Sequence, residues 1–384
     1  MDDAPHAQQG IYFNPSLPPG MPVMAPIEEM TDNLEAEDAS MISDDSASID
    51  DQMYYSCVSV RLSLRQWLTL GSSTYTASLS AVTYPVEFGR RYHAYRHGAY
   101  YLPNDDDEMD RLDMTHNLTL KMLDDQLYLA PLVKQNIRKI LDIGTGTGIW
   151  AMEMGDLFPN AEVRNPREDG MSPREGQELN TLHVHRVPPN VKFEIDDVES
   201  PWIGDRKYDF IFCRYMIGSI ADYPRLIRNI YDNLNPGGWA EFTDMSGKYY
   251  SADGTLSEEH ATYKWNNMLM DTIASMGGES RPGPQLEGWV REAADFRNVV
   301  HRKYILPIGP WPKDPHYREL GLINLIQILE GLEGFSMRTF CGVLGWSKVQ
   351  AEVMLAQVRN ELKAVHMFHA QFHIHSVVAQ KPYE

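Results

Sequence analysis

The stretch KILDIGTGTGIWAMEMGDLF, residues 139–158, decides the fold. Its first five residues are mostly apolar and lead into three closely spaced glycines, after which the pattern becomes helical. Glycines directly after a strand let the backbone approach a ligand that any Cβ would keep away. The stretch therefore predicts a strand, a tight ligand-binding turn and a helix.

The spacing of the glycines limits the class of ligand that the turn could bind. A dinucleotide-binding turn has the spacing G-x-G-x-x-G, and Ile149 stands where its third glycine belongs. Asp142 also lies two residues before Gly144, at the end of the predicted strand. A carboxylate there would repel a pyrophosphate but suits a cationic amino-acid group. Both features disfavour a nicotinamide-dependent dehydrogenase.

Strand and helix patterns alternate after this turn. Strands are predicted at 192–197, 208–216 and 239–245, with a helix at 223–234 and a turn, NPGG, at 235–238. This alternation is typical of an α/β protein with a doubly wound parallel sheet. Helical segments follow at 257–276, 285–295, about 316–331 and 347–365.

The glycine turn with its preceding acid resembles motif I of class I S-adenosylmethionine-dependent methyltransferases. In that family the acid helps to hold the methionine end of the cofactor. KFEIDDVESPW, residues 192–202, resembles the acidic loop after the third strand of the same fold, near the adenine amino group. The resemblance implies that S-adenosyl-L-methionine is bound by Asp142, Gly144, Thr145, Gly146, Gly148 and by Asp196 or Asp197.

A narrower resemblance comes from GRRYHAYRHGAYYLPNDDDEMDRLDMTH, residues 89–116. Together with LDIGTGTGIWA and LNPGGW, it is similar to the LaeA-like fungal methyltransferases, which include regulators of secondary metabolism. The similarity covers roughly residues 87–382, with one gap. It implies that the upstream segment folds over the cofactor site, with roles for Tyr92, Tyr95 and Arg111. Core packing and a salt bridge on a helix face are the alternative readings of these residues.

The gap lies at 164–186, where the second strand and its ribose-binding acid are expected. Pro166 removes a ladder donor, and charged residues replace the aliphatics of a central strand, so we expect no regular strand there. Glu168 or Asp169 is then a poor substitute for the missing acid. We hypothesise that this stretch and the apolar patch 53–72 are gene-model artefacts. A sequenced transcript that encodes both unchanged would refute this.

Composition and charge limit the function further. The 384 residues include 34 Lys and Arg against 54 Asp and Glu, a net charge of −20 that disfavours nucleic-acid binding. Three distant cysteines indicate a reducing compartment, and no secretory signal or run of about 18 apolar residues is present. We therefore expect a cytoplasmic or nuclear protein that neither enters a membrane nor binds nucleic acid.

The chain divides into a leader and a catalytic domain. Residues 1–52 hold 12 acidic residues and six prolines, and the first basic residue is Arg61. We expect a disordered acidic leader over 1–83 and the methyltransferase domain over 84–384, with helical cap insertions at about 255–365. An acidic interaction tail is the alternative reading of the leader.

The C-terminal histidines offer a possible metal site. If 366–380 forms one half-exposed closing strand, His369, His373 and His375 share a face, but no acid or cysteine completes a zinc site. We expect no metal. No general base is assigned either, although the candidates are His93, His97, His116, Arg214 and Tyr215.

We expect a methyltransferase that acts on a small molecule of fungal secondary metabolism. Two alternatives remain: a LaeA-type nuclear regulator working in a protein complex, and a degenerate methyltransferase fold that binds partners without cofactor. Cofactor binding separates the first two from the third. Co-purification with nuclear proteins separates the first from the second.

Overall fold

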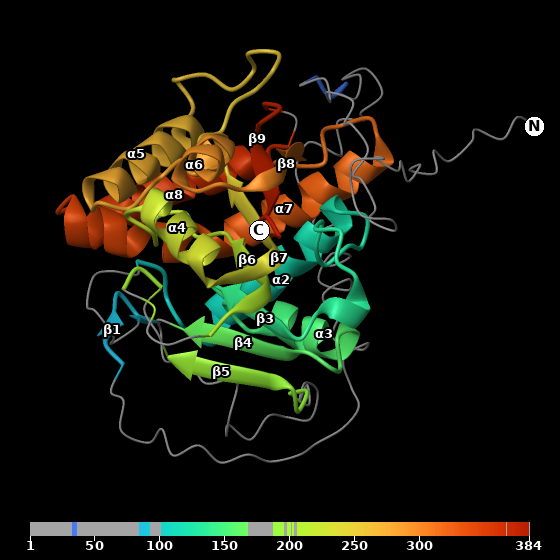
Figure 1. The fold of residues 1–384 in the computed structure, drawn as a ribbon. Helices are drawn as coiled ribbons and strands as arrows, with labels where there is room; N and C mark the ends of the chain where they lie inside the picture. The colour runs from blue at the N-terminus through green and yellow to red at the C-terminus, as the bar shows by residue number, and fades with distance from the viewer. Residues whose placement is uncertain are drawn as a thin grey trace, which may run out of the picture.

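A computed structural model describes residues 33–36, 84–92, 101–167, 187–195, 198–200, 202, 206–365 and 367–383. In these residues the main sheet has seven strands in the order β5-β4-β3-β6-β7-β9-β8 (Figure 1). The strands are β3 (Lys139–Ile143), β4 (Glu162–Arg167), β5 (Val191–Ile195), β6 (Tyr208–Arg214), β7 (Leu234–Met245), β8 (Arg297–Pro307) and β9 (Gln371–Gln380).

The strands from β5 to β7 are parallel, whereas β9 pairs antiparallel with both β7 and β8. The expected doubly wound α/β fold is confirmed, with a mixed sheet at its C-terminal side. Carboxyl ends of parallel strands gather at one edge of such a sheet, where ligands bind. The glycine turn follows β3 at that edge.

Helices cover both faces of the sheet, since side chains along a strand alternate between faces. Phe210 and Phe212 of β6 pack into one core cluster, and Ile211 and Cys213 pack into the other. The first cluster contains residues of α2 (Asp106–Met122), α3 (Ile149–Leu157), α5 (Ala261–Ser275), α7 (Pro315–Ser336) and α8 (Lys348–Lys363). The second contains residues of α4 (Tyr223–Asn233) and α6 (Leu286–Ala293).

The second strand of the fold corrects the expectation that 164–186 begins without one. β4 pairs with β3 over Glu162–Arg164 and with β5 from Val163 to Arg167. The ladder with β3 ends before Pro166, so the missing N–H of the proline costs no bond to β3. Glu168 and Asp169 lie outside the described residues.

The C-terminal strand also differs from the expectation of a half-exposed closing strand. β9 is second from the edge, because β8, which the sequence pattern did not reveal, pairs with its outer side. It is almost entirely buried, because its side chains pack into the core clusters on both faces of the sheet. It begins at Gln371, so His369 lies before it. No cluster of three His, Cys, Asp or Glu able to hold a metal occurs in the described residues.

Other elements agree with the sequence patterns. The four C-terminal helices are present, and Asp105 caps α2 by accepting a hydrogen bond from the Glu108 N–H. The NPGG segment is part of β7 rather than a free turn, with a register shift where β7 meets β6. Within the expected leader, Ala36 forms a bridge with Pro312.

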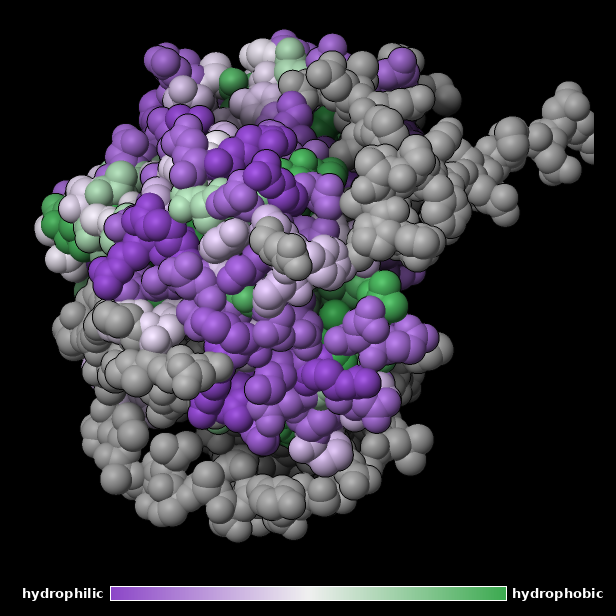
Figure 2. All heavy atoms as spheres, in the orientation of Figure 1, coloured by the Kyte–Doolittle hydropathy of each residue, from purple (hydrophilic) through white to green (hydrophobic). Residues whose placement is uncertain are grey.

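The smaller elements are β1 (Val86–Glu87), β2 (Arg90–Arg91), η3 (Lys134–Asn136), η4 (Gly283–Gln285) and η5, a π-helix (Met337–Val343). On the face drawn in Figure 2, hydrophilic residues predominate among the coloured atoms. Among the described residues, no helix is long and apolar enough to cross a membrane.

Candidate functional site

The glycine turn has a backbone that only glycine adopts without strain. Gly144, Gly146 and Gly148 all have positive φ angles, of 76°, 56° and 85°. A Cβ on Gly144 would lie 2.1 Å from Met216 Sδ, and one on Gly148 would lie 2.8 Å from the Phe193 ring. Among the described residues, a Cβ on Gly146 has one neighbour within 4 Å, Leu112 at 3.6 Å. Packing against described residues therefore explains two of the glycines but not Gly146.

Two polar side chains beside the turn are buried. Asp142 is 2 % exposed, and the buried amide of Asn165 donates to its Oδ2 at 3.1 Å in the amide orientation that satisfies both groups. Thr145 Oγ1 is buried and has no hydrogen-bond partner among the described residues. A buried hydroxyl without a partner is costly unless a ligand supplies one. The turn thus contains an unmet hydrogen-bonding group.

A chain of three charged or polar residues crosses the carboxyl edge of the sheet. Arg214 ends β6, and its Nη2 lies 3.0 Å from Nδ1 of His116 on α2. The His116 Nε2 lies 2.9 Å from Glu153 Oε2 on α3. Burial lowers the pKa of His116, and Arg214 lowers it further, although Glu153 opposes both effects. The imidazole is therefore neutral, accepting from Arg214 and donating to Glu153.

Helix α2 covers the turn. Leu112 approaches Gly146, His116 binds Arg214, and one turn later the Thr119 hydroxyl lies 2.8 Å from the Tyr215 hydroxyl. Tyr215 has a φ of 55°, which is rare for a residue other than glycine. Such backbone outliers cluster at functional sites. The outlier lies directly after β6, at the edge where the glycine turn lies.

Asp244 fixes the chain beyond β6 from the neighbouring strand β7. Its Oδ2 accepts from the Met216 N–H at 2.8 Å and from the Tyr223 hydroxyl at 3.0 Å, and its Oδ1 accepts from the Met245 N–H. Burial raises the pKa of Asp244 to about 7. Sequence reasoning missed this residue, since a single acid at the end of a strand carries no signal of its partners.

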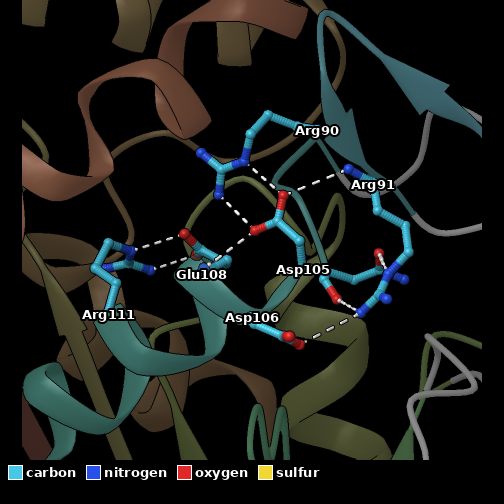
Figure 3. A network of polar contacts seen from close by, with 7 residues as sticks. Arg90, Arg91, Asp105, Asp106, Glu108 and Arg111 are labelled. Atoms are coloured by element: carbon cyan, nitrogen blue, oxygen red, sulfur yellow. Dashed lines mark hydrogen bonds and ion pairs between the residues drawn. The ribbon is translucent and has the colours of Figure 1, made fainter. Parts of the chain in front are cut away.

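A buried ionic network joins the β1–β2 hairpin to the start of α2 (Figure 3). Arg111 makes two hydrogen bonds to Glu108, at 2.9 and 2.6 Å, and a third to Gln327 of α7. Arg90 makes two to Asp105, at 2.5 and 2.6 Å. Bidentate pairs of this kind are rigid. The network therefore holds α2 in place over the turn.

Tyr92 lies beside this network. It is completely buried, with the Arg338 guanidinium 4.7 Å from its ring centre. Its hydroxyl has no hydrogen-bond partner in the part of the chain that the structure describes. Burial raises the pKa of Tyr92 to about 12, so the hydroxyl stays protonated.

The structure brings together only some of the residues implicated by the sequence. The ones around the turn are Asp142, Gly144, Thr145, Gly146 and Gly148. Arg111 lies in the network at the start of α2, and Tyr92 lies beside it against Arg338. Asp196, Asp197 and Tyr95 lie outside the described residues. The contacts of Asn165 were missed because its segment was not expected to form a strand.

Comparison with known proteins identifies the family. A methyltransferase-domain family model matches residues 114–301. Methyltransferase pytC of Aspergillus terreus is 42 % identical over 82 % of this chain and 94 % of its own. The secondary metabolism regulator LAE1 of Cochliobolus heterostrophus is 32 % identical over 77 % of this chain and 94 % of its own.

A solved structure, phosphoethanolamine N-methyltransferase 2 of Haemonchus contortus, matches with a TM-score of 0.39 and 17 % identity, over 69 % of this chain and 52 % of that one. Both fungal relatives align with this chain over 94 % of their own length. The chain belongs to the LaeA-like family of fungal S-adenosylmethionine-dependent methyltransferases.

Proposed function

We propose that this protein binds S-adenosylmethionine at the glycine turn and transfers its methyl group to a small hydrophobic molecule of fungal secondary metabolism. The observation that carries the proposal is the turn itself. Three left-handed glycines, the unmet Thr145 hydroxyl and the buried Asp142 carboxylate meet at the carboxyl edge of the sheet.

These residues suit the chemistry of the cofactor. Asp142 would hold the ammonium of its amino-acid end, and the backbone from Gly144 to Gly148 would pack against its adenosyl part, with the Thr145 hydroxyl gaining a partner. Asp196 or Asp197 remains our assignment for the adenine amino group. Arg111 would act on the site by holding α2 rather than by direct contact, and Tyr92 remains our assignment as a cofactor-site residue beside the same network.

The bound cofactor supplies a methyl group already activated on a sulfonium. The chain's own residues must then position the acceptor and exclude water. Helix α2 suits the second task, because Leu112, His116 and Thr119 lie over the turn and the end of β6. We assign no general base.

Three tyrosines favour a small acceptor. Tyr101 is buried near Gly218, Tyr215 binds Thr119, and Tyr249 stacks on Phe372 with ring centres 5.4 Å apart. Burial raises the pKa of all three phenols, so they stay neutral. An edge covered by neutral aromatic side chains suits an apolar molecule better than an extended polypeptide.

The second candidate is a LaeA-type regulator that methylates or binds a protein. The 32 % identity to LAE1 supports it. The two candidates differ in where the methyl group goes. Purified protein would be incubated with methyl-labelled S-adenosylmethionine and heat-inactivated fungal extract, which removes other methyltransferases. Label would then be counted in the organic-solvent extract and in precipitated protein.

We expect label in the organic extract, and none when Gly146→Val replaces the wild type. Label confined to precipitated protein would support the regulator instead. If neither fraction gains label although the cofactor binds, the small-molecule proposal is overturned for every acceptor in that extract, and the partner-binding reading gains support.

A further inference from the structure

We infer that Arg214 binds the α-carboxylate of the cofactor, so that Arg214 and Asp142 together recognise the two charges of its amino-acid end. The inference rests on the proposed function and adds to it the residue that selects this end of the ligand.

In the described part of the chain, no acid contacts the charge of Arg214 directly. Among the described residues, no carboxylate forms an ion pair with its guanidinium, and Asp142, Glu153 and Glu241 oppose the effect of burial on its pKa only from a longer distance. Its contacts are His116 Nδ1 at 3.0 Å and the rings of Phe212 and Tyr215, each centred 5.6 Å away. Burial lowers the pKa of Arg214, which reports the cost of removing this cation from water.

The contrast with the neighbouring arginines is informative. Arg90 and Arg111 are each paired with a carboxylate through two hydrogen bonds. Partly buried guanidinium groups normally find such a partner, because an unpaired charge away from water is expensive. A ligand carboxylate would pair with the Arg214 guanidinium in the same way.

The position of Arg214 fits a ligand in the glycine turn. Its carbonyl oxygen lies 3.4 Å from the place where a Cβ on Gly144 would stand. Asp142 pairs with Phe212 across β3 and β6, two residues before Arg214. Because side chains alternate along a strand, Asp142, Phe212 and Arg214 lie on the same face of the sheet.

The cation of Arg214 and the anion of Asp142 thus stand on adjacent strand ends, where they attract each other electrostatically. The amino-acid end of the cofactor carries one ammonium and one carboxylate, which match these two side chains. His116 acts as a positioning residue here. It accepts from one Arg214 N–H and is itself held by Glu153, which leaves the other guanidinium N–H groups for a ligand.

The test uses two ligands that differ by one group. Decarboxylated S-adenosylmethionine keeps the sulfonium and the ammonium of the cofactor but lacks its carboxylate. Calorimetric titration would give the affinity of each ligand for wild-type protein and for Arg214→Met. A charge-assisted pair predicts that wild type prefers the carboxylated ligand by roughly 10- to 150-fold.

In Arg214→Met this preference should disappear. The affinity for the decarboxylated ligand should stay within about twofold of wild type, since that ligand never used Arg214. Arg228→Met removes an exposed arginine from α4 and serves as the control. It should leave both affinities unchanged.

Several outcomes would overturn the inference. Arg214→Met could retain the full preference, or lose both ligands in parallel, which would mean that Arg214 only supports the fold. If that variant fails to fold, Arg214→Lys is measured in its place. Lysine keeps the charge but lacks the planar guanidinium group, so this variant should lose part of the preference for the carboxylated ligand. An unchanged preference would refute the assignment. Wild type that binds neither ligand would instead refute the proposed function.

Discussion

His116 Nδ1 lies 3.0 Å from Arg214 Nη2, which ties helix α2 to the end of strand β6 directly beside the glycine turn. The contact requires a neutral imidazole, because a protonated His116 has no lone pair to accept with and would face a second cation. The covering of the site by α2 therefore depends on the protonation of one buried side chain.

This dependence predicts a pH effect on stability. Burial lowers the pKa of His116 in the folded state below the value of about 6.5 expected in the unfolded chain. As pH falls through about 6.5, the unfolded state takes up a proton that the folded state refuses, so stability declines. The free energies of unfolding of wild type and His116→Gln should therefore converge as pH falls from about 7.5 to 5.5. A gap independent of pH would contradict a neutral His116.

Glu241 should give the opposite pH dependence. Its Oε2 accepts from the N–H groups of Leu129 and Ala130, and burial raises its pKa to about 7. The folded state then holds a proton that the unfolded state releases above about 4.3, so this contribution to stability is lost as pH rises through 7. Glu241→Gln keeps the acceptor without the charge. Relative to wild type it should gain on the order of 3 kcal/mol between pH values of about 4 and 8, measured by urea unfolding. Parallel pH curves would show that Glu241 does not titrate there.

Substitution of two glycines should separate the effect of a side chain on cofactor binding from its effect on backbone strain. Gly146→Val and Gly254→Val both place a side chain on a left-handed backbone, with φ of 56° and 75°, and neither is blocked by a neighbour closer than 3.6 Å. The free energy of unfolding should fall by a similar amount in both variants, on the order of 1–2 kcal/mol. Only Gly146→Val should weaken S-adenosylhomocysteine binding, by roughly 100-fold, or about 2.7 kcal/mol. Equal affinities in the two variants would show that the turn is not the site.

The ionic network predicts a large stability loss from a small change. The Glu108 and Arg111 side chains are 1 % and 8 % exposed, and breaking such a buried pair on one side costs about 3–5 kcal/mol. Glu108→Gln should lower the free energy of unfolding by about that much. Lys348→Met breaks an exposed pair with Glu352 at the same kind of helical spacing and should cost about 0.5 kcal/mol or less. Similar losses in the two variants would mean that the network does not hold α2.

The core of the fold could be predicted from local patterns. The turn after β3, the helix α4 and the C-terminal helices each depend on residues close in sequence, such as the three glycines that directly follow β3. β4 was mispredicted because Pro166 and its charged neighbours argue against a strand. The strand forms nevertheless, because its ladder with β3 ends at Arg164, before the proline, while its ladder with β5 continues to Arg167.

The long-range contacts of the site could not be predicted. Asp142 and the glycines can be recognised from their spacing in the sequence. Arg214 and His116 are 98 residues apart, and neither belongs to a motif from which their contact could be predicted. The pattern of β9 likewise predicts a half-exposed strand, whereas its side chains pack into core clusters on both faces of the sheet, and it pairs with β8, about 70 residues earlier in the chain. The periodicity of a sequence indicates which face of an element is apolar, but it does not identify the elements that pack against either face.

The most direct test of the account is calorimetric titration of S-adenosylhomocysteine into the full-length protein. We predict one binding site per chain with a dissociation constant on the order of micromolar, or about −8 kcal/mol, accompanied by a rise in melting temperature. The absence of both binding heat and thermal stabilisation at roughly 1 mM ligand would contradict cofactor binding at the glycine turn. It would leave a methyltransferase fold that works by binding partners.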